Sequence, residues 1–135
     1  MIDLEATIST VLRADPGVAA IVADRVWLSR PKDPTYPAVY VSRVTGAAGI
    51  PWNPGQALHD EGDFDLHCYG GSRVEALALA QACIAALAVA RDRIGIAPWN
   101  LLHLPDPDLP KSGGRDRERY VSTFHAYATE RAASP

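Results

Sequence analysis

The stretch Asp63–Arg91, DFDLHCYGGSRVEALALAQACIAALAVAR, decides the fold because it holds a strand, a glycine turn and a helix in immediate succession. Phe64, Leu66 and Cys68 alternate with polar residues, and this period of two predicts a strand with one buried face. The pair Gly70–Gly71 then interrupts the strand. The stretch therefore predicts a strand that turns directly into the main helix.

The start of this helix has its own signal. Ser72 is followed three positions later by Glu75, which predicts a capping box in which both side chains bind free N–H groups of the first turn. Strong helix formers follow, and Arg91 and Arg93 stand where the negative end of the helix dipole favours cations.

The main helix is apolar on more than one side. One stripe at helical spacing is made by Val74, Leu77, Ile84 and Leu87. A second stripe is made by Leu79, Cys83, Ala86 and Ala90. A helix that is apolar most of the way round is either buried on several sides or covered by a partner. We predict that the second stripe is a subunit interface. The competing interpretation is that it belongs to the core.

The remaining segments predict one small α+β domain. Asp3 is expected to cap an N-terminal helix, and Asp15–Pro16 to start a short second helical turn with Pro16 at its first position. Strands are predicted at residues 25–28, 37–44, 57–69, 98–104 and 119–130. The order favours a mostly antiparallel sheet packed by the long Ala-rich helix and the N-terminal helix over residues 1–130. Residues 131–135 are expected to be a frayed tail.

Two segments are candidate loops for contact with a partner; the competing interpretations are that Trp52 folds back on the sheet and that the charged run at Arg115 and Arg117 is a solvated strand entrance. Residues 46–55 are rich in Gly and Pro and present Trp52 and Asn53 near the tip. The second segment contains Arg115 and Arg117 within a charged run. Long loops in small domains are often functional, and exposed aromatic and Arg side chains are frequent anchors in interfaces.

Composition excludes several classes of function. The 135 residues carry a net charge of −3, which offers no overall attraction to nucleic acid or to acidic membranes. Two separated cysteines indicate a reduced, cytoplasmic history rather than a disulfide framework. The polar N-terminus predicts no signal peptide, and no apolar run is long enough to span a membrane.

A metal site is not predicted, although five residues could bind metals: His59, Asp60, His67, Cys68 and His103. Adjacent residues on a strand point to opposite faces, so neither His59 with Asp60 nor His67 with Cys68 can chelate together. None of the spacings typical of zinc sites is present.

Catalytic signals are equally weak. Asp63 and Asp65 share one strand face and could form an acid–base pair, but polar residues opposite Phe64 and Leu66 are what a solvated face requires. Cys83 lies in an apolar helix, where a thiol behaves as a small core residue. We therefore predict that the protein is not an enzyme and needs no cofactor.

Four stretches, in this order, resemble the tail completion (tail terminator) proteins of long-tailed bacteriophages and of phage-derived gene transfer agents. They are ADPGVAAIVADRVW (Ala14–Trp27), YPAVYVS (Tyr36–Ser42), FDLHCYGGSRVEALALAQACIAAL (Phe64–Leu87) and RYVSTFHAYATE (Arg119–Glu130). The order of the parts is more specific than any one of them. The chain departs from the family in its 46–55 loop and in the proline-rich segment 104–110, so no residue role carries over there.

The resemblance implies a structural virion protein, assembled in the host bacterial cytoplasm, that forms a ring, commonly of six copies. Such a ring caps the head-proximal end of the tail tube, halts tube polymerisation and offers a docking surface to the head connector. Its expected partners are therefore further copies of itself, the tail tube protein and a connector or stopper protein. DNA is expected to pass through the lumen without sequence-specific binding, and no membrane is involved.

Three alternatives remain open. The first is a connector or stopper protein of the same particle, distinguished by whether it binds tube or head. The second is a small cytoplasmic enzyme that uses the face carrying His67 and Asp65. The third is an α+β interaction module outside any virion.

Overall fold

The computed structural model describes residues 3–29, 31–32, 34–49, 57–90, 95–104 and 118–131, with the backbone alone at 45–49, 57–60, 97–99 and 128–131. The elements are α1 (Leu4–Ala14), α2 (Pro16–Val22), β1 (Val26–Trp27), β2 (Ala38–Gly49), β3 (Ala57–Gly70), α3 (Arg73–Val89), β4 (Gly95–His103) and β5 (Glu118–Arg131). None of these helices combines the length and apolar character needed to cross a membrane.

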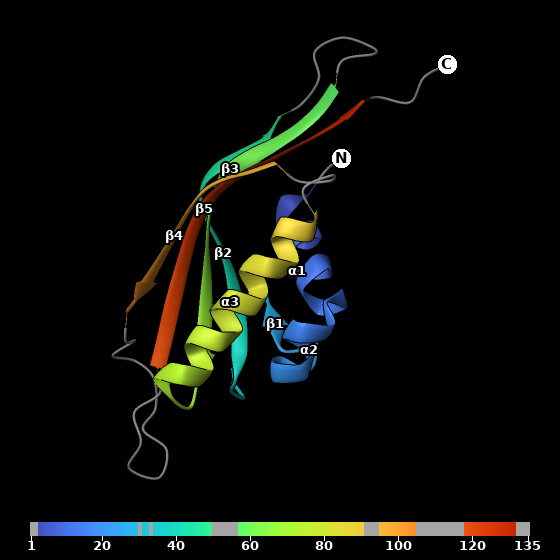
Figure 1. The fold of residues 1–135 in the computed structure, drawn as a ribbon. Helices are drawn as coiled ribbons and strands as arrows, with labels where there is room; N and C mark the ends of the chain where they lie inside the picture. The colour runs from blue at the N-terminus through green and yellow to red at the C-terminus, as the bar shows by residue number, and fades with distance from the viewer. Residues whose placement is uncertain are drawn as a thin grey trace.

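The fold has two layers. Its sheet has the strand order β1-β2-β3-β5-β4, in which β1 pairs with β2 in parallel and the other pairs are antiparallel. The three described helices lie on one face of the sheet, and none of them covers the other face (Figure 1). The prediction of an α+β fold with a mostly antiparallel sheet is confirmed.

Local capping explains where the helices begin. The Asp3 side chain accepts a hydrogen bond from the Ala6 N–H at 3.2 Å, and Asp15 accepts one from the Val18 N–H at 3.0 Å. Pro16 occupies the first turn of α2, where its missing N–H removes no helical bond. The predicted Asp3 cap and the predicted start of the second helix at Asp15–Pro16 are confirmed.

The cap of α3 differs from the prediction in one bond. The Glu75 N–H donates to Ser72 Oγ at 3.1 Å, as in a capping box. The Glu75 carboxylate, however, accepts from the N–H of Gly71 at 2.9 Å, one residue before the cap. The glycine turn is thereby tied to the first turn of the helix.

The core lies between the helices and the inner sheet face. The Phe64 and Phe124 rings stack there with centroids 5.9 Å apart, and the Arg43 guanidinium lies 4.8 Å from the Phe64 centroid. Arg43 Nε also donates to Glu5 Oε1 at 2.8 Å, which links β2 to α1. The predicted alternation of β3 is confirmed, since Phe64, Leu66 and Cys68 are fully buried.

The predicted subunit interface on the main helix is wrong, because these side chains are in the protein's own core. The four residues and their exposed fractions are Leu79 at 0%, Cys83 at 0%, Ala86 at 4% and Ala90 at 2%. Their stripe faces the sheet and the helices α1 and α2, which bury it within one protomer.

The sheet bends at the level where β2, which extends beyond its short pairing with β1, and the edge strand β4 each carry a β-bulge. Two successive rungs consist of Arg43, Phe64, Phe124 and Trp99, then of Thr45, Asp63, His125 and Ala97. Between these rungs β2 and β4 each have one extra residue, Val44 in β2 and Pro98 in β4. Bulges bend a strand and increase its twist, so two at the same level bend the sheet as a unit.

Beyond the bulges the strands continue past the helical layer as an arm (Figure 1). The arm consists of residues 45–49 of β2, 57–63 of β3, 125–131 of β5 and 95–97 of β4. The predicted loop at 46–55 is therefore corrected, because β2 extends to Gly49 through its pairing with β3. Arg131, assigned to the tail by sequence, is the last residue of β5.

Candidate interaction surfaces

The outward face of α3 lacks charge along most of its length. Its exposed residues are Arg73, Val74, Glu75, Ala78, Gln81, Ala85 and Val89. Val74 is 79% exposed and Val89 is 83% exposed, and no charged residue occurs between Ala76 and Ala90. Helices that face only water carry charged residues on that side, so this surface has the character of a contact surface.

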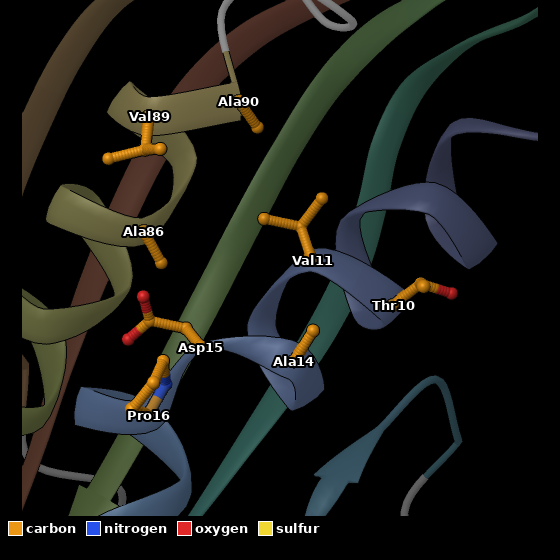
Figure 2. Close-up of a pocket in the computed structure, with 8 residues that line it drawn as sticks. All are labelled: Thr10, Val11, Ala14, Asp15, Pro16, Ala86, Val89 and Ala90. Atoms are coloured by element: carbon orange, nitrogen blue, oxygen red, sulfur yellow. The ribbon is translucent and has the colours of Figure 1, made fainter.

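A pocket of about 210 Å³ opens at the C-terminal end of this surface, between α3 and the junction of α1 with α2. Its lining is Thr10, Val11, Ala14, Asp15, Pro16, Ala86, Val89 and Ala90. Figure 2 shows Val11, Ala86, Ala90 and the Asp15 carboxylate turned toward the same space. The lining is largely apolar with one carboxylate, and Val89 joins the pocket to the outward face of α3.

The open face of the sheet carries a histidine between two carboxylates at the base of the arm. His125 Nδ1 lies 3.0 Å from Asp63 Oδ1, and Nε2 lies 3.2 Å from Glu61 Oε2. Both acceptors are carboxylates, so both contacts are hydrogen bonds only when the ring carries two protons. These bonds, first to Asp63 and then to Glu61, raise the pKa of His125.

Aromatic rings gather at the other end of the same face. Trp27 packs edge-on against Tyr36 at 5.9 Å, and Tyr36 lies 5.4 Å from Tyr69. Tyr40 lies 5.5 Å from His67. The rings, apart from the buried Tyr69, are partly accessible.

Comparison with known proteins agrees with this architecture. The family described as Tail completion protein gp17 matches residues 6–129. The chain belongs to this family. A chain from the virion of a native gene transfer agent (GTA) particle has the same fold, with a TM-score of 0.56 and 20% identity, over 93% of this chain and 94% of that one. A search of curated proteins found no match.

Membership makes the protein a structural component of a phage-type tail, a class that is generally not enzymatic. The chemistry of this tail completion protein is consistent with that class. Cys68 and Cys83 lie side by side in the core, where the hydrogen bond between the two side chains and burial raise the pKa of the Cys68 thiol. A thiol held protonated in this way is a poor nucleophile.

The other candidate residues are distributed as follows. Trp52, Asn53, Arg115 and Arg117 lie outside the described residues. His67 and Cys68 face opposite sides of the sheet, as predicted. Within the described part of the chain, no three His, Cys, Asp or Glu side chains converge as a metal site would require.

Sequence reasoning missed the His125 cluster of this tail completion protein. His125 and Asp63 could not be paired from sequence, because they are 62 positions apart in the chain and lie on different strands. The signal that remained in the sequence was the period of two along each strand, in which His125 and Asp63 each alternate with buried residues.

Proposed function

We propose that the protein forms a ring at the head-proximal end of the tail tube, where it ends tube polymerisation and joins the tail to the head connector. The observation that carries the proposal is the outward face of α3, which lacks charge between Ala76 and Ala90, on a member of the tail completion family. In a ring each protomer buries one patch against a different patch of its neighbour, so such a face is covered by the next copy.

The face that we assign to the ring replaces the one expected from sequence. Val74, Ala78, Ala85 and Val89 point away from the protomer's core, whereas the stripe with Leu79 and Cys83 points into it. Burying the outward valines removes apolar surface from water, worth roughly 25 cal/mol per Å². The copy number of six, the passage of DNA through the lumen and assembly in the host cytoplasm are parts of the same proposal.

The test is a mixing experiment with tail tubes that lack this protein, viewed by negative-stain electron microscopy. Wild-type protein should give tubes of fixed length with a cap at one end. Val89→Asp should fold normally and cap poorly, because a carboxylate is buried without a partner at the ring contact. Leu28→Asp is the control, since Leu28 is 41% exposed and lies outside α3.

Two results would redirect the proposal. If the protein leaves tubes uncapped and decorates DNA-filled heads instead, it is a connector or stopper protein. If Val89→Asp caps as well as wild type, the outward face of α3 is not the ring contact.

A further inference from the structure

The sheet has a free edge in the arm. Strand β1 pairs with only two residues of β2, Val39 and Tyr40. Beyond the bulge, the segment Thr45–Gly49 pairs with β3 on one side, and no other described strand lies on its second side. Such an edge presents unpaired N–H and C=O groups, and native proteins usually block or use it.

The direction of each backbone group follows from the ladder. The Val39 N–H donates to the Arg25 carbonyl at 2.9 Å, so Val39 faces β1 and Tyr40 faces β3. Residues alternate in this way along an antiparallel pair, so on β3 His67, the partner of Tyr40, faces β2. Since β3 pairs with β5 without a register shift, its alternation continues unbroken to Glu61.

This alternation fixes which residues of the free edge face outward. Asp63 and Glu61 face β2, so their partners Thr45 and Ala47 face β3. Gly46 and Ala48 therefore direct their N–H and C=O groups away from the sheet. The sequence Gly46–Gly49, GAAG, has no bulky side chain to hinder a strand laid alongside.

The opposite edge of the sheet has a matching geometry. Strand β4 pairs with β5 and, among the described residues, with no other strand. The register runs from Gly95 through Tyr127 and Glu61 to Ala47, so both edges reach the same level of the sheet. Because β2–β3, β3–β5 and β5–β4 are each antiparallel, β4 runs opposite to β2, and the two edges would meet as an antiparallel pair.

We propose that the free edge Thr45–Gly49 of β2 pairs, backbone to backbone, with the β4 edge of a second copy. Each copy offers one edge of each kind, so the contact is head-to-tail and is repeated from copy to copy until a ring closes. The sheet then continues from one subunit to the next. This inference rests on the proposed ring and adds the element that joins its subunits.

A pair of proline variants at adjacent alanines tests this contact. Ala48→Pro removes an N–H that faces away from β3, and an edge strand tolerates proline at such a position. The midpoint of urea denaturation of the protomer should therefore equal that of wild type. Its ring formation, followed by light scattering and negative-stain microscopy with tube ends present, should require at least tenfold more protein. Ala47→Pro removes an N–H that faces β3 and should instead destabilise the protomer.

Amide hydrogen exchange of the wild type provides the second measurement and does not depend on how well either variant folds. The N–H groups of Gly46 and Ala48 should become protected when rings form. If rings form and these amides exchange as fast as in the protomer, the edge contact is overturned while the ring stands. Equal ring formation by a folded Ala48→Pro protein would have the same meaning. If wild-type protein forms no ring even at tube ends, the proposed function itself fails, and the edge contact with it.

Discussion

Gly70 ends β3 where the backbone of α3 passes close to it. A Cβ atom at Gly70 would lie 2.6 Å from the Ala76 nitrogen, closer than real Cβ atoms approach backbone. Gly71 has room, since the nearest atom to its Cβ would be Glu75 Oε1 at 3.8 Å. Only the first glycine is therefore required by packing.

We expect Gly70→Ala to lower the free energy of unfolding by about 1–3 kcal/mol, the usual range for overpacking against atoms that cannot move aside. Gly71→Ala should change it by less than about 1 kcal/mol in either direction. Urea denaturation of the two variants checks this, and equal effects would contradict the steric argument.

His125 should make stability depend on pH. Its pKa is raised in the folded protein by hydrogen bonds to Asp63 and Glu61, so the folded state binds its proton more tightly than the unfolded chain does. The stabilisation is complete below the ordinary His pKa of 6.5 and is lost as pH rises through the raised pKa.

Thermal unfolding of wild type and His125→Gln at pH 6 and at pH 9 measures this effect. The melting temperature of wild type should exceed that of the variant by more at pH 6 than at pH 9. The difference should be small, since the three side chains are 40–50% exposed. A gap that widens with rising pH would show that the cluster binds the neutral ring.

Residue-level signals were reliable where their cause is local. Asp3 and Ser72 were predicted as caps, and Asp15–Pro16 as a helix start, because a cap bonds within three residues of itself. His125 and Asp63 belong to different strands, and only the register of the folded sheet brings them together. Helix caps could thus be predicted from the sequence, and contacts between residues of different strands could not.

At the scale of elements, α3 shows why an apolar pattern can predict burial without predicting the partner. Both stripes of this helix are apolar, and the sequence contains no charge to distinguish the inner side from the outer. Packing of α1 and α2 beside α3 buries Leu79 and Cys83, and leaves Val74 and Val89 outside. The choice depends on where two other helices lie, which the helix's own sequence does not encode.

Substitutions on the two sides of α3 should therefore have opposite effects. Leu79→Ala should lower the free energy of unfolding by roughly 2–5 kcal/mol, and Leu79→Asp should leave the protein unfolded. Val89→Ala should change it by less than about 0.5 kcal/mol. Chemical denaturation of the isolated protomer checks this. A folded, soluble Leu79→Asp monomer would contradict this and support the original prediction that the Leu79 stripe is a subunit interface.

At the scale of the molecule, the order of helices and strands was predictable, and the bend was not. Alternation and turn residues located every strand core, but Gly46–Gly49 has little strand propensity of its own. These residues form a strand because β3 continues beside them. The extra residues Val44 and Pro98 become bulges only against fixed partners, so the sequence alone does not mark them.

Deleting Val44 should change the shape of the molecule more than its stability. Val44 is 56% exposed, and its removal keeps Arg43 opposite Phe64 and Thr45 opposite Asp63. We expect the free energy of unfolding, measured by urea denaturation, to stay within about 1 kcal/mol of wild type. Tube capping should be markedly reduced, because β2 loses its bend. Val44→Ala retains the bulge and should cap normally. Normal capping by the deletion would show that the bend of β2 is not needed.

The bend also means that a rotation at the two bulges would move the whole arm relative to the helical layer. The part of β2 beyond it, Thr45–Gly49, spans about 17 Å at the ~3.4 Å rise of antiparallel strands. A rotation of about 10° at the bulges would therefore move the far end by about 3 Å, close to one residue of strand. In the proposed ring every arm would turn in the same sense, so a small rotation at the bulges of each subunit would shift all the arm tips together.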